Sequence, residues 1–434
     1  MARDLRNTMK VVVLGGNGAM GAGSGEVFAA AGIPTVLLAR TRDKAETGRA
    51  RIESMAKAEA ISALVTTGSY DDDLAREVAD ADLIFEAVSE DLDLKRVYFE
   101  QVDAARKPDS IVATVSSGLS IAAMTDGRSD SFARHFLGIH FFNPPNVIVG
   151  CELIPHAGTD PEVTAFVEAL LAGPLGREVV KTSDTPAFAG NRVGFKVLNE
   201  VAQLAEQHGV AYMDALIGPH TGRAMSPLVT VDFVGWDVHK AIVDNVAANT
   251  SDEANAAFAL PGYMAKLIDA GHLGNKTPAT GGFYRAADQQ TFVLDPTSGD
   301  YRPAAEVVAE PPEIALQMKA AIRVGRYGRA MEIFATARGD DADLMRKVVL
   351  GYISYGLGRV GEVVEQPRDV DRIMGFGFNW APPSVLVDDL GARRTVQLLE
   401  TAGLPVPRCI VGAAERNQPL FAEPNVDTGR FYFA

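Results

Sequence analysis

The sequence predicts an α/β domain with a doubly wound sheet, followed by an all-α region made of two related helical repeats. Three observations predict this fold class. A glycine-rich loop lies between two short apolar runs near the N-terminus, and apolar runs then alternate with helix-like segments up to about residue 185. From Pro186 onward, long helical patterns dominate and few strand-like runs remain.

The first strand and the loop after it have the pattern of a phosphate-binding turn. Val11–Leu14 is a short β-branched run typical of a buried parallel strand, and a second strand is expected over Thr35–Ala39. Between them, Gly16, Gly18 and Gly21 have the spacing G-x-G-x-x-G. We expect Gly16 to permit the tight turn and Gly18 to let backbone N–H groups approach a pyrophosphate. Gly21 should let the following helix pack close to the sheet. The unit predicts a Rossmann-type dinucleotide site, with a purely structural glycine turn as the alternative.

The residues that follow the second strand bear on which dinucleotide binds. NAD sites usually place Asp or Glu at the end of this strand, where the carboxylate holds the ribose hydroxyls. Here the strand ends at Ala39, Arg40 and Arg42 follow, and the first carboxylate is Asp43. An arginine could hold a 2′-phosphate, which would favour NADP, or both could be solvated surface residues. NAD is the expected cofactor, and NADP stays open.

Further strands and helices complete the first domain, which we place at residues 1–185. Its remaining strands are expected over residues 82–87, 111–114, 136–141 and 147–154, with a helix over 94–105. Beyond this domain we expect a first helical domain over 186–290, a connector over 291–340 and a second helical repeat over 341–434.

The duplication rests on matched positions. Residues 214–218 resemble 371–375, and the set Pro227, Asp232 and Gly235 recurs with identical internal spacing as Pro383, Asp388 and Gly391. Each set follows a long helical pattern, such as the one over 192–207. Several matches at equal spacing favour duplication, and chance similarity between helical segments is the alternative.

A histidine and a glutamate lie on neighbouring apolar runs. His140 ends one run, and Glu152 lies inside the next, between Cys151 and Leu153. A buried carboxylate is costly unless it is paired, and a histidine would pair with it. Such a pair suits hydride transfer from an alcohol, because the histidine takes the hydroxyl proton while the carboxylate orients the ring. The alternative is that His140 is an ordinary core residue.

Ordered motifs along the chain make the sequence resemble the 3-hydroxyacyl-CoA dehydrogenase family. The resemblance covers residues 1 to about 290 and continues more weakly to the C-terminus; it is closest to long bacterial members that are normally fused to enoyl-CoA hydratase. The motifs are Gly-Ala-Met-Gly at 18–21, Glu86 to Glu90 with Lys95, Ser116 to Leu119, His140 to Pro144, Glu152, 184–186 with 190–194, 274–277 with 281–284, and 295–296 with 301–303.

The resemblance implies roles for the matching residues. The implied catalytic residues are His140 as general base, Glu152 as its partner, and Ser117 and Asn191 as contacts of the reacting oxygen. The expected cofactor site comprises Gly16, Gly18, Met20, Gly21, Arg40, Glu90, Lys95 and Asn143; the resemblance places Glu90 and Lys95 near the ribose, and Arg40 is included for the 2′-phosphate considered above. In the alternative, Glu90 and Lys95 are ordinary charges at a helix start, and Ser117 and Asn191 are helix caps. No metal is expected.

The implied activity is the reversible oxidation of a 3-hydroxyacyl-CoA to a 3-oxoacyl-CoA with hydride transfer to NAD, as in fatty-acid β-oxidation. An NADPH-dependent 3-oxoacyl-CoA reductase and a non-catalytic subunit of a β-oxidation complex are the alternatives. Three features depart from the family: Ala39 replaces a ribose-binding Asp, Val115 replaces an Asn, and the hydratase domain is absent. A separate enoyl-CoA hydratase or thiolase could therefore be a partner.

The helical region has two implied functions, closing over the acyl chain and dimerisation. The duplicated helices could mimic a dimer interface within one chain, so a monomer and a homodimer both fit. Phe233 and Trp236 could line an acyl tunnel, although core packing is the more common role for such residues.

Composition excludes several other classes of protein. Hydrophobic residues make up 47% and charged residues 22% of the 434 residues, as in globular proteins. The formal net charge of −15 disfavours nucleic-acid binding. Two cysteines cannot form a disulfide framework or a zinc finger, and they fit a reducing compartment. No apolar run is long enough to span a bilayer or to act as a secretory signal, so we expect a cytoplasmic protein.

Overall fold

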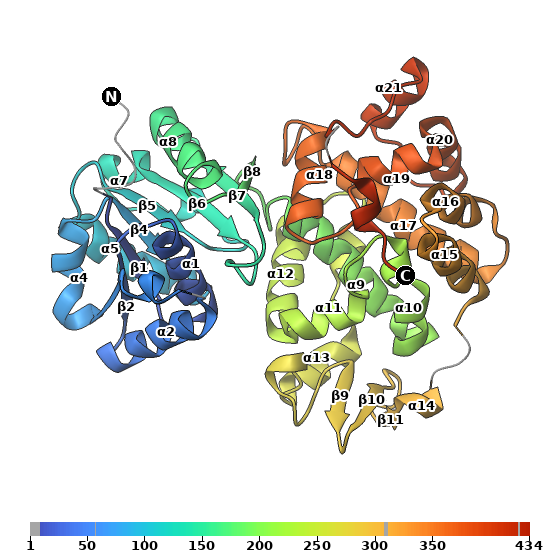
Figure 1. The fold of residues 1–434 in the computed structure, drawn as a ribbon, viewed down its shortest axis with the longest axis horizontal. Coiled ribbons are helices and arrows are strands. Elements are labelled where there is room, and N and C mark those ends of the chain that lie inside the picture. Colours follow the sequence, from blue (N-terminus) through green and yellow to red (C-terminus); the bar gives the residue numbers. More distant parts are fainter. Residues whose placement is uncertain (1–8, 57, 308–310, 424–425) are drawn as a thin grey trace. The chain divides into compact units, whose positions relative to one another are not determined.

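The computed structural model describes residues 9–56, 58–307, 311–423 and 426–434. The chain divides into two compact units, one ending at Phe188 and the other beginning at Ala189 (Figure 1). Residues 1–8 of the predicted first domain and 308–310 of the predicted connector lie outside the described residues, as do 57 and 424–425.

Eight strands form one sheet in the first unit, in the order β3-β2-β1-β4-β5-β6-β7-β8. Neighbouring strands run parallel except β6 and β7, which are antiparallel. The strands are β1 (Val11–Leu14), β2 (Thr35–Ala39), β3 (Val65–Ser69), β4 (Leu83–Glu86), β5 (Ile111–Thr114), β6 (Phe136–Phe141), β7 (Gly150–Pro155) and β8 (Glu178–Lys181). The predicted doubly wound fold is confirmed, although β3 and β8 were not predicted.

Helices cover both faces of this sheet. They are α1 (Ala19–Ala30), α2 (Arg42–Met55), α3 (Glu59–Ser62), α4 (Tyr70–Ala79), α5 (Leu92–Ala105), α6 (Ile121–Met124), α7 (Asp130–Arg134) and α8 (Pro161–Ala172). Alternate residues of β1 point to opposite faces, so Val11 and Val13 join a core with α1, α2 and α8. Val12 and Leu14 join a second core, with α4 to α7.

The second unit is mainly helical. Its α-helices are α9 (Gly190–His208), α10 (Val210–Leu216), α11 (Pro227–Val234), α12 (Trp236–Asn249), α13 (Gly262–Asp269), α14 (Ala304–Val307), α15 (Glu313–Arg323), α16 (Tyr327–Thr336), α17 (Asp340–Gly358), α18 (Pro367–Phe376), α19 (Pro383–Leu390), α20 (Ala392–Thr401) and α21 (Arg408–Arg416). The 3₁₀ turns among its described residues are η1 (Pro219–Thr221), η2 (Asn255–Phe258), η3 (Gly274–Lys276) and η4 (Thr428–Phe431).

The turn-rich stretch before residue 304, which we expected to be a connector, folds into a small sheet. Its three antiparallel strands are β9 (Tyr284–Ala287), β10 (Gln290–Leu294) and β11 (Tyr301–Pro303), in the order β11-β10-β9. The predicted helical region is confirmed with this addition. Its strands have few buried residues, so the apolar pattern that indicates a strand is weak here.

Equivalent aspartates make equivalent contacts in the two halves of the second unit. A carboxylate oxygen of Asp214 accepts a hydrogen bond from the N–H of Leu228, in the first turn of α11, at 2.9 Å. Asp371 accepts one from Ser384, in the first turn of α19, also at 2.9 Å. Asp232 accepts from two consecutive backbone N–H groups, those of Phe283 and Tyr284, and Asp388 accepts from those of Leu420 and Phe421. These matched contacts support the duplication inferred from sequence.

The two repeats meet through equivalent loops. Ala224 N–H donates to the carbonyl of Asn379, and Ala381 N–H donates to the carbonyl of Gly222. The offset that relates Asp214 to Asp371 also relates residues 222–224 to 379–381, so these two bonds are related by a local pseudo-two-fold axis. The buried guanidinium of Arg223 lies 4.7 Å from the ring centroid of Trp380 at this contact.

The two aromatic residues proposed for an acyl tunnel have different environments. Trp236 is fully buried, its Nε1 donates to Asp232 at 2.7 Å, and its ring packs on Phe283. The expectation of core packing is therefore confirmed for Trp236. It is wrong for Phe233, which is 45% exposed beside the partly exposed Val229 on α11.

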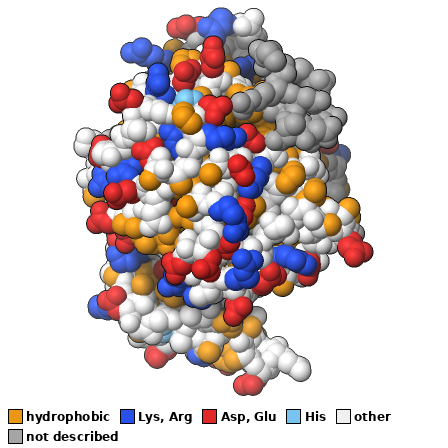
Figure 2. Space-filling model, turned by 90° about the vertical axis from the view of Figure 1, so that its left-hand side faces the viewer, with side chains coloured by type: hydrophobic (Ala, Val, Ile, Leu, Met, Phe, Trp, Pro, Cys, Tyr) orange, Lys and Arg blue, Asp and Glu red, His pale blue; other side chains and the backbone are white. Residues whose placement is uncertain are grey.

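Two observations bear on the classes of protein that composition disfavours, namely nucleic-acid-binding proteins and membrane-spanning proteins. On the face drawn in Figure 2, basic and acidic side chains are interspersed rather than gathered by sign. Of the helices that the described residues form, none combines the length and the apolar composition that crossing a bilayer requires.

We predict that Asp371→Asn makes the protein more stable above pH 7. Burial raises the pKa of Asp371 from 3.8 to about 7. Between these values the folded protein binds the extra proton, so stability falls as pH rises through this window. The variant should lose that dependence and gain roughly 1 kcal/mol at pH 8, measured by urea unfolding. A variant less stable than wild type at pH 8 would contradict this prediction.

The same substitution at Asp214 is the matched comparison. In the wild-type protein, the Oδ2 atom of Asp214 accepts hydrogen bonds from the Tyr284 hydroxyl and the Val229 N–H. Asp371 has Phe421 in place of Tyr284, and phenylalanine carries no hydroxyl. Because an amide NH₂ cannot accept these bonds, Asp214→Asn should lower stability at pH 8.

Candidate functional site

His140 and Glu152 form a buried pair across two antiparallel strands. Their positions are directly opposite in the register of β6 and β7, which places both side chains on one face of the sheet. His140 Nδ1 lies 2.6 Å from a carboxylate oxygen of Glu152. Glu152 is fully buried, and His140 is 5% exposed. When Nδ1 carries the proton and donates to Glu152, Nε2 is left as the acceptor on the other side of the ring.

Aromatic rings fix the position of the imidazole. Phe142 lies edge-on to it with ring centroids 4.8 Å apart, and Phe188 lies 5.8 Å away. Packing against these two rings limits rotation of the imidazole. The arrangement can therefore accept a proton at Nε2 while Glu152 stabilises the resulting positive charge.

The loop after β6 packs on the glycine-rich helix. Asn143, predicted to bind cofactor, is exposed on this loop. Pro145 lies against Gly23 of α1 so closely that a Cβ at Gly23 would come within 2.9 Å of it. Arg177 donates to the carbonyls of Pro145 and Ile148, at 2.8 and 2.9 Å. The loop that follows the histidine strand is therefore packed on α1, the helix that follows the dinucleotide loop.

The glycine loop has the geometry that close backbone packing requires. A Cβ at Gly21 would lie 2.2 Å from the carbonyl oxygen of Gly15, and one at Gly16 would lie 2.7 Å from Leu37. Gly18 is the N-cap residue of α1 and has no side chain to cover the helix start. A Cβ at Gly18 would lie 3.4 Å from the carbonyl oxygen of Gly15, which is an ordinary van der Waals distance. The N-terminus of this helix thus presents backbone N–H groups next to Met20, which fits the pyrophosphate of a dinucleotide.

A buried ion pair supports the carboxyl end of the sheet. Glu86, the last residue of β4, and Lys95 on α5 have fully buried side chains, with Lys95 Nζ 2.8 and 2.9 Å from the two carboxylate oxygens. The hydroxyl of Thr114 and the N–H of Val88 also donate to Glu86, each at 2.6 Å. Glu86 belongs to a motif quoted from sequence, but sequence assigned it no role. A glutamate that ends an apolar strand is the signal for a paired buried carboxylate.

Glu90 links this ion pair to the loop that carries Ser117. Lys95 Nζ lies 3.5 Å from one carboxylate oxygen of Glu90. The other oxygen accepts hydrogen bonds from the Ser116 hydroxyl at 2.5 Å and the Ser117 N–H at 2.9 Å. The loops after β4 and β5 are therefore cross-linked. The described contacts of Lys95 are with glutamates, so contact of Glu90 and Lys95 with a ribose stays a prediction.

The two arginines after β2 are not equivalent. Arg42 forms an ion pair with Asp73 at 2.9 Å and donates to the carbonyl of Thr67 at 2.8 Å. Arg40 is exposed and forms no hydrogen bond or ion pair with any residue that the structure describes. Of the two, Arg40 is therefore the one whose guanidinium is available to a 2′-phosphate.

Neither Ser117 nor Asn191 caps a helix. The cap of α6 is Ser120, and that of α9 is Ala189. The alternative roles considered for Ser117 and Asn191 are therefore wrong. His140, Glu152 and Ser117 belong to the first unit, whereas Asn191 is buried in the first turn of α9 in the second.

Asp184, which belongs to a quoted motif but was assigned no role, anchors the segment leading out of the first unit. Asp184 accepts hydrogen bonds from the N–H groups of Ile121 and Ala122, at 2.8 and 2.9 Å, and from the hydroxyl of Ser120. Its partners lie more than 60 residues away in the chain, so this anchoring could not be read from the sequence.

Two family models match most of the chain. The NAD-binding domain of 3-hydroxyacyl-CoA dehydrogenase matches residues 10–185, and the C-terminal domain of the same enzyme matches 188–286. The second match ends before the second helical repeat.

Known proteins of the same name are similar over long stretches. A probable 3-hydroxyacyl-CoA dehydrogenase of Bacillus subtilis is 30% identical over 448 residues, covering 96% of this chain. The chain spans 55% of that protein's length. One of Deinococcus radiodurans is 33% identical over 290 residues, 64% of this chain and 82% of the relative. The crystal structure of Escherichia coli 3-hydroxybutyryl-CoA dehydrogenase shares the fold, with a TM-score of 0.69, 22% identity and coverage of 94% and 99% of the two chains.

The buried pair beneath the site yields a stability prediction. Lys95→Met should lower the free energy of unfolding by about 3–5 kcal/mol, because it leaves the carboxylate of Glu86 buried without its counter-charge. Urea unfolding measures the change. Lys107→Met is the matched control, since Lys107 pairs with Asp82 at the same 2.8 Å but both side chains are partly exposed. The control should cost at most about 1 kcal/mol, and an equal cost for both variants would contradict the prediction.

Proposed function

Because this chain belongs to the 3-hydroxyacyl-CoA dehydrogenase family, we propose that it interconverts a 3-hydroxyacyl-CoA and a 3-oxoacyl-CoA, with NAD as hydride acceptor, in reactions of the fatty-acid β-oxidation type. The observation that carries the proposal is the buried hydrogen bond of 2.6 Å between His140 and Glu152. A base held in one tautomer by a carboxylate is what proton removal from a secondary alcohol requires.

In the proposed mechanism, Nε2 of His140 takes the proton of the 3-hydroxyl. Glu152 keeps the ring oriented and stabilises the imidazolium. Ser117 and Asn191 bind the oxygen and hold the reacting carbon in line. The bound nicotinamide supplies the hydride acceptor. In the reverse direction, the imidazolium of His140 donates the proton to the forming alkoxide.

The proposed cofactor site follows the geometry of the first unit. Gly16, Gly18, Met20 and Gly21 would hold the pyrophosphate at the N-terminus of α1. Arg40 would lie at the adenosine ribose, and Glu90, Lys95 and Asn143 would lie toward the second ribose and the nicotinamide. The close approach of Gly21 to Gly15 supports this assignment, because a side chain at position 21 would force the helix away from the loop.

A second candidate function is NADPH-dependent reduction of a 3-oxoacyl-CoA. Two observations favour it: Ala39 stands where NAD sites carry an acidic residue, and Arg40 is available. The remaining alternative, a non-catalytic subunit of a β-oxidation complex, has less support, because the His140–Glu152 pair is intact.

The proposed setting is the cytoplasm, which the two free thiols of Cys151 and Cys409 support. We propose an acyl-CoA as the substrate, a monomer or homodimer as the active form, and a separate enoyl-CoA hydratase or thiolase as a partner. The pseudo-two-fold contact between the repeats supports a monomer, because equivalent loops already pair within one chain.

The direct test is reduction of acetoacetyl-CoA and of a longer 3-oxoacyl-CoA by purified protein, with NADH and NADPH side by side. We expect turnover with NADH. Turnover only with NADPH would establish the second candidate function instead. Absence of turnover with both dinucleotides, from a protein that still binds one, would contradict both enzymatic proposals.

The same assay tests the role of Arg40. If Arg40 binds a 2′-phosphate, Arg40→Ala should lower kcat/KM for NADPH by about tenfold and leave that for NADH unchanged, because a charge-assisted bond is lost only with NADPH. Arg42→Ala is the matched control, since Arg42 is engaged by Asp73. Equal losses with both dinucleotides would contradict this role.

A further inference from the structure

The glycine-rich loop of the first unit is anchored by a side chain from a distant part of the chain. The N–H of Gly15, the residue that follows β1, donates a hydrogen bond to the hydroxyl of Tyr70 at 2.8 Å. Tyr70 is the first residue of α4, 55 positions away in the sequence. Among the residues that the structure describes, no other side chain bonds to the backbone of residues 15–18.

Gly15 is the residue on which the turn of this loop closes. Its carbonyl accepts a hydrogen bond from the N–H of Gly18 at 3.0 Å, and Gly18 is the N-cap of α1. The φ angle of Gly15 is +77°, and an added Cβ would lie 2.3 Å from the carbonyl oxygen of Ala87. Only glycine fits in this conformation and this space. The position of Gly15 therefore sets how the loop leads into the N-terminus of α1.

Two consecutive N–H groups attach the loop to two different elements. The N–H of Gly16 donates to the carbonyl of Leu38 in β2 at 2.9 Å, a bond between backbone groups that does not depend on side-chain identity. The N–H of Gly15 is held instead by the Tyr70 hydroxyl. Removal of that hydroxyl would leave this N–H without its protein partner and the loop with one of these two attachments.

The start of α4 holds Tyr70 in a fixed position. Ser69 caps the helix with its hydroxyl, and its N–H donates to Asp73 at 2.9 Å. Asp73 is 2% exposed and forms an ion pair with Arg42 of α2. The ring of Tyr70 packs on Tyr98 of α5, with ring centroids 4.6 Å apart. Both the backbone and the ring of Tyr70 are restrained, so its hydroxyl is a fixed acceptor for the loop.

We propose that Tyr70 is a positioning residue for the dinucleotide, because its hydroxyl holds the glycine-rich loop in the conformation that receives the pyrophosphate. The hydroxyl acts through Gly15. In the free protein it keeps the loop ready to bind, so that binding does not have to order the loop. This inference rests on the part of the proposed function that places the pyrophosphate at the N-terminus of α1. Tyr70 then determines cofactor affinity, whereas proton transfer belongs to His140.

Tyr70→Phe tests the proposal, because it removes the hydroxyl and keeps the ring on Tyr98. We expect the Kd for NADH, measured by fluorescence titration, to rise about fivefold as the binding-competent fraction of the loop falls. The Kd for ADP-ribose, which carries the pyrophosphate without the nicotinamide, should rise by the same factor. At saturating NADH, kcat for acetoacetyl-CoA reduction should stay unchanged, because His140 and Glu152 are untouched.

Hydrogen exchange separates an effect on the loop from a general loss of stability. In the free Tyr70→Phe variant, the amides of residues 15–18 should exchange faster than in the wild-type protein, and saturating NADH should slow them again. The amides of β6, the strand that carries His140, should exchange at the wild-type rate.

Tyr98→Phe is the matched control. Tyr98 is the stacking partner of Tyr70, and its hydroxyl forms no hydrogen bond with any residue that the structure describes. This variant removes a hydroxyl from the same aromatic pair without touching the loop. The Kd values for NADH and ADP-ribose should therefore stay at their wild-type values.

Two results would overturn the proposal: an unchanged Kd for NADH in Tyr70→Phe, or an equal rise in both tyrosine variants. The binding measurements do not use the acyl-CoA reaction. A wild-type protein that binds NADH and ADP-ribose without reducing acetoacetyl-CoA would refute the proposed dehydrogenase activity, and the Kd values would still decide the role of Tyr70. A wild-type protein that binds neither ligand would overturn both proposals.

Discussion

The hydrogen bond between His140 and Glu152 is the contact on which the account of this protein depends. It forms because β6 and β7 run antiparallel in an otherwise parallel sheet, which places the two residues directly opposite. Burial makes the bond strong and also makes it obligatory, since an unpaired carboxylate at Glu152 would be costly. The same contact therefore stabilises the sheet and prepares the base.

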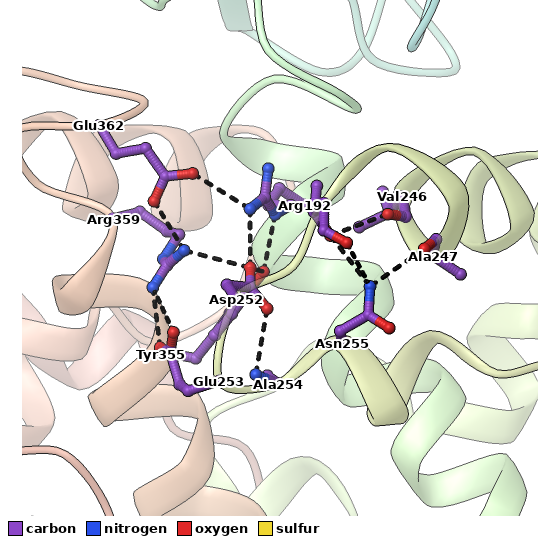
Figure 3. A network of polar contacts seen from close by, with 11 residues as sticks. Arg192, Val246, Ala247, Asp252, Glu253, Ala254, Asn255, Tyr355, Arg359 and Glu362 are labelled. Carbon is purple, nitrogen blue, oxygen red and sulfur yellow. Dashed lines mark hydrogen bonds and ion pairs between the residues drawn. The ribbon is translucent and has the colours of Figure 1, made fainter.

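Other polar contacts hold the surrounding loops at the carboxyl ends of the strands. Lys95 joins Glu86 to Glu90, and Glu90 holds the backbone of Ser117. In the second unit, Arg192 in the first turn of α9 donates hydrogen bonds to Tyr355 and Asp252 (Figure 3). In the first unit, the ion pair of Lys95 therefore supports the loop of Ser117, a residue expected to contact the reacting oxygen. The loops of the proposed site in the first unit are thus held by ionic contacts beneath them.

Much of the fold and the central pair could be predicted from the sequence, because apolar runs and glycine spacing are local signals. Strand β3 was missed because two of its residues are exposed or half-exposed threonines, which leaves no continuous apolar run. The anchoring of α6 by Asp184 and the link from Tyr355 to Arg192 could not be predicted, since their partners lie far apart in the chain. The engagement of Arg42 by Asp73, which leaves Arg40 available, likewise required coordinates.

The most direct test of the central claim is the turnover of His140→Gln, measured beside its affinity for NADH. Glutamine keeps a polar side chain of similar reach but cannot act as a general base. The account predicts that kcat for acetoacetyl-CoA reduction falls by about 10²–10⁴-fold, while the Kd for NADH stays within about twofold of wild type. A variant that turned over at near the wild-type rate would contradict the assignment of His140 as the catalytic base.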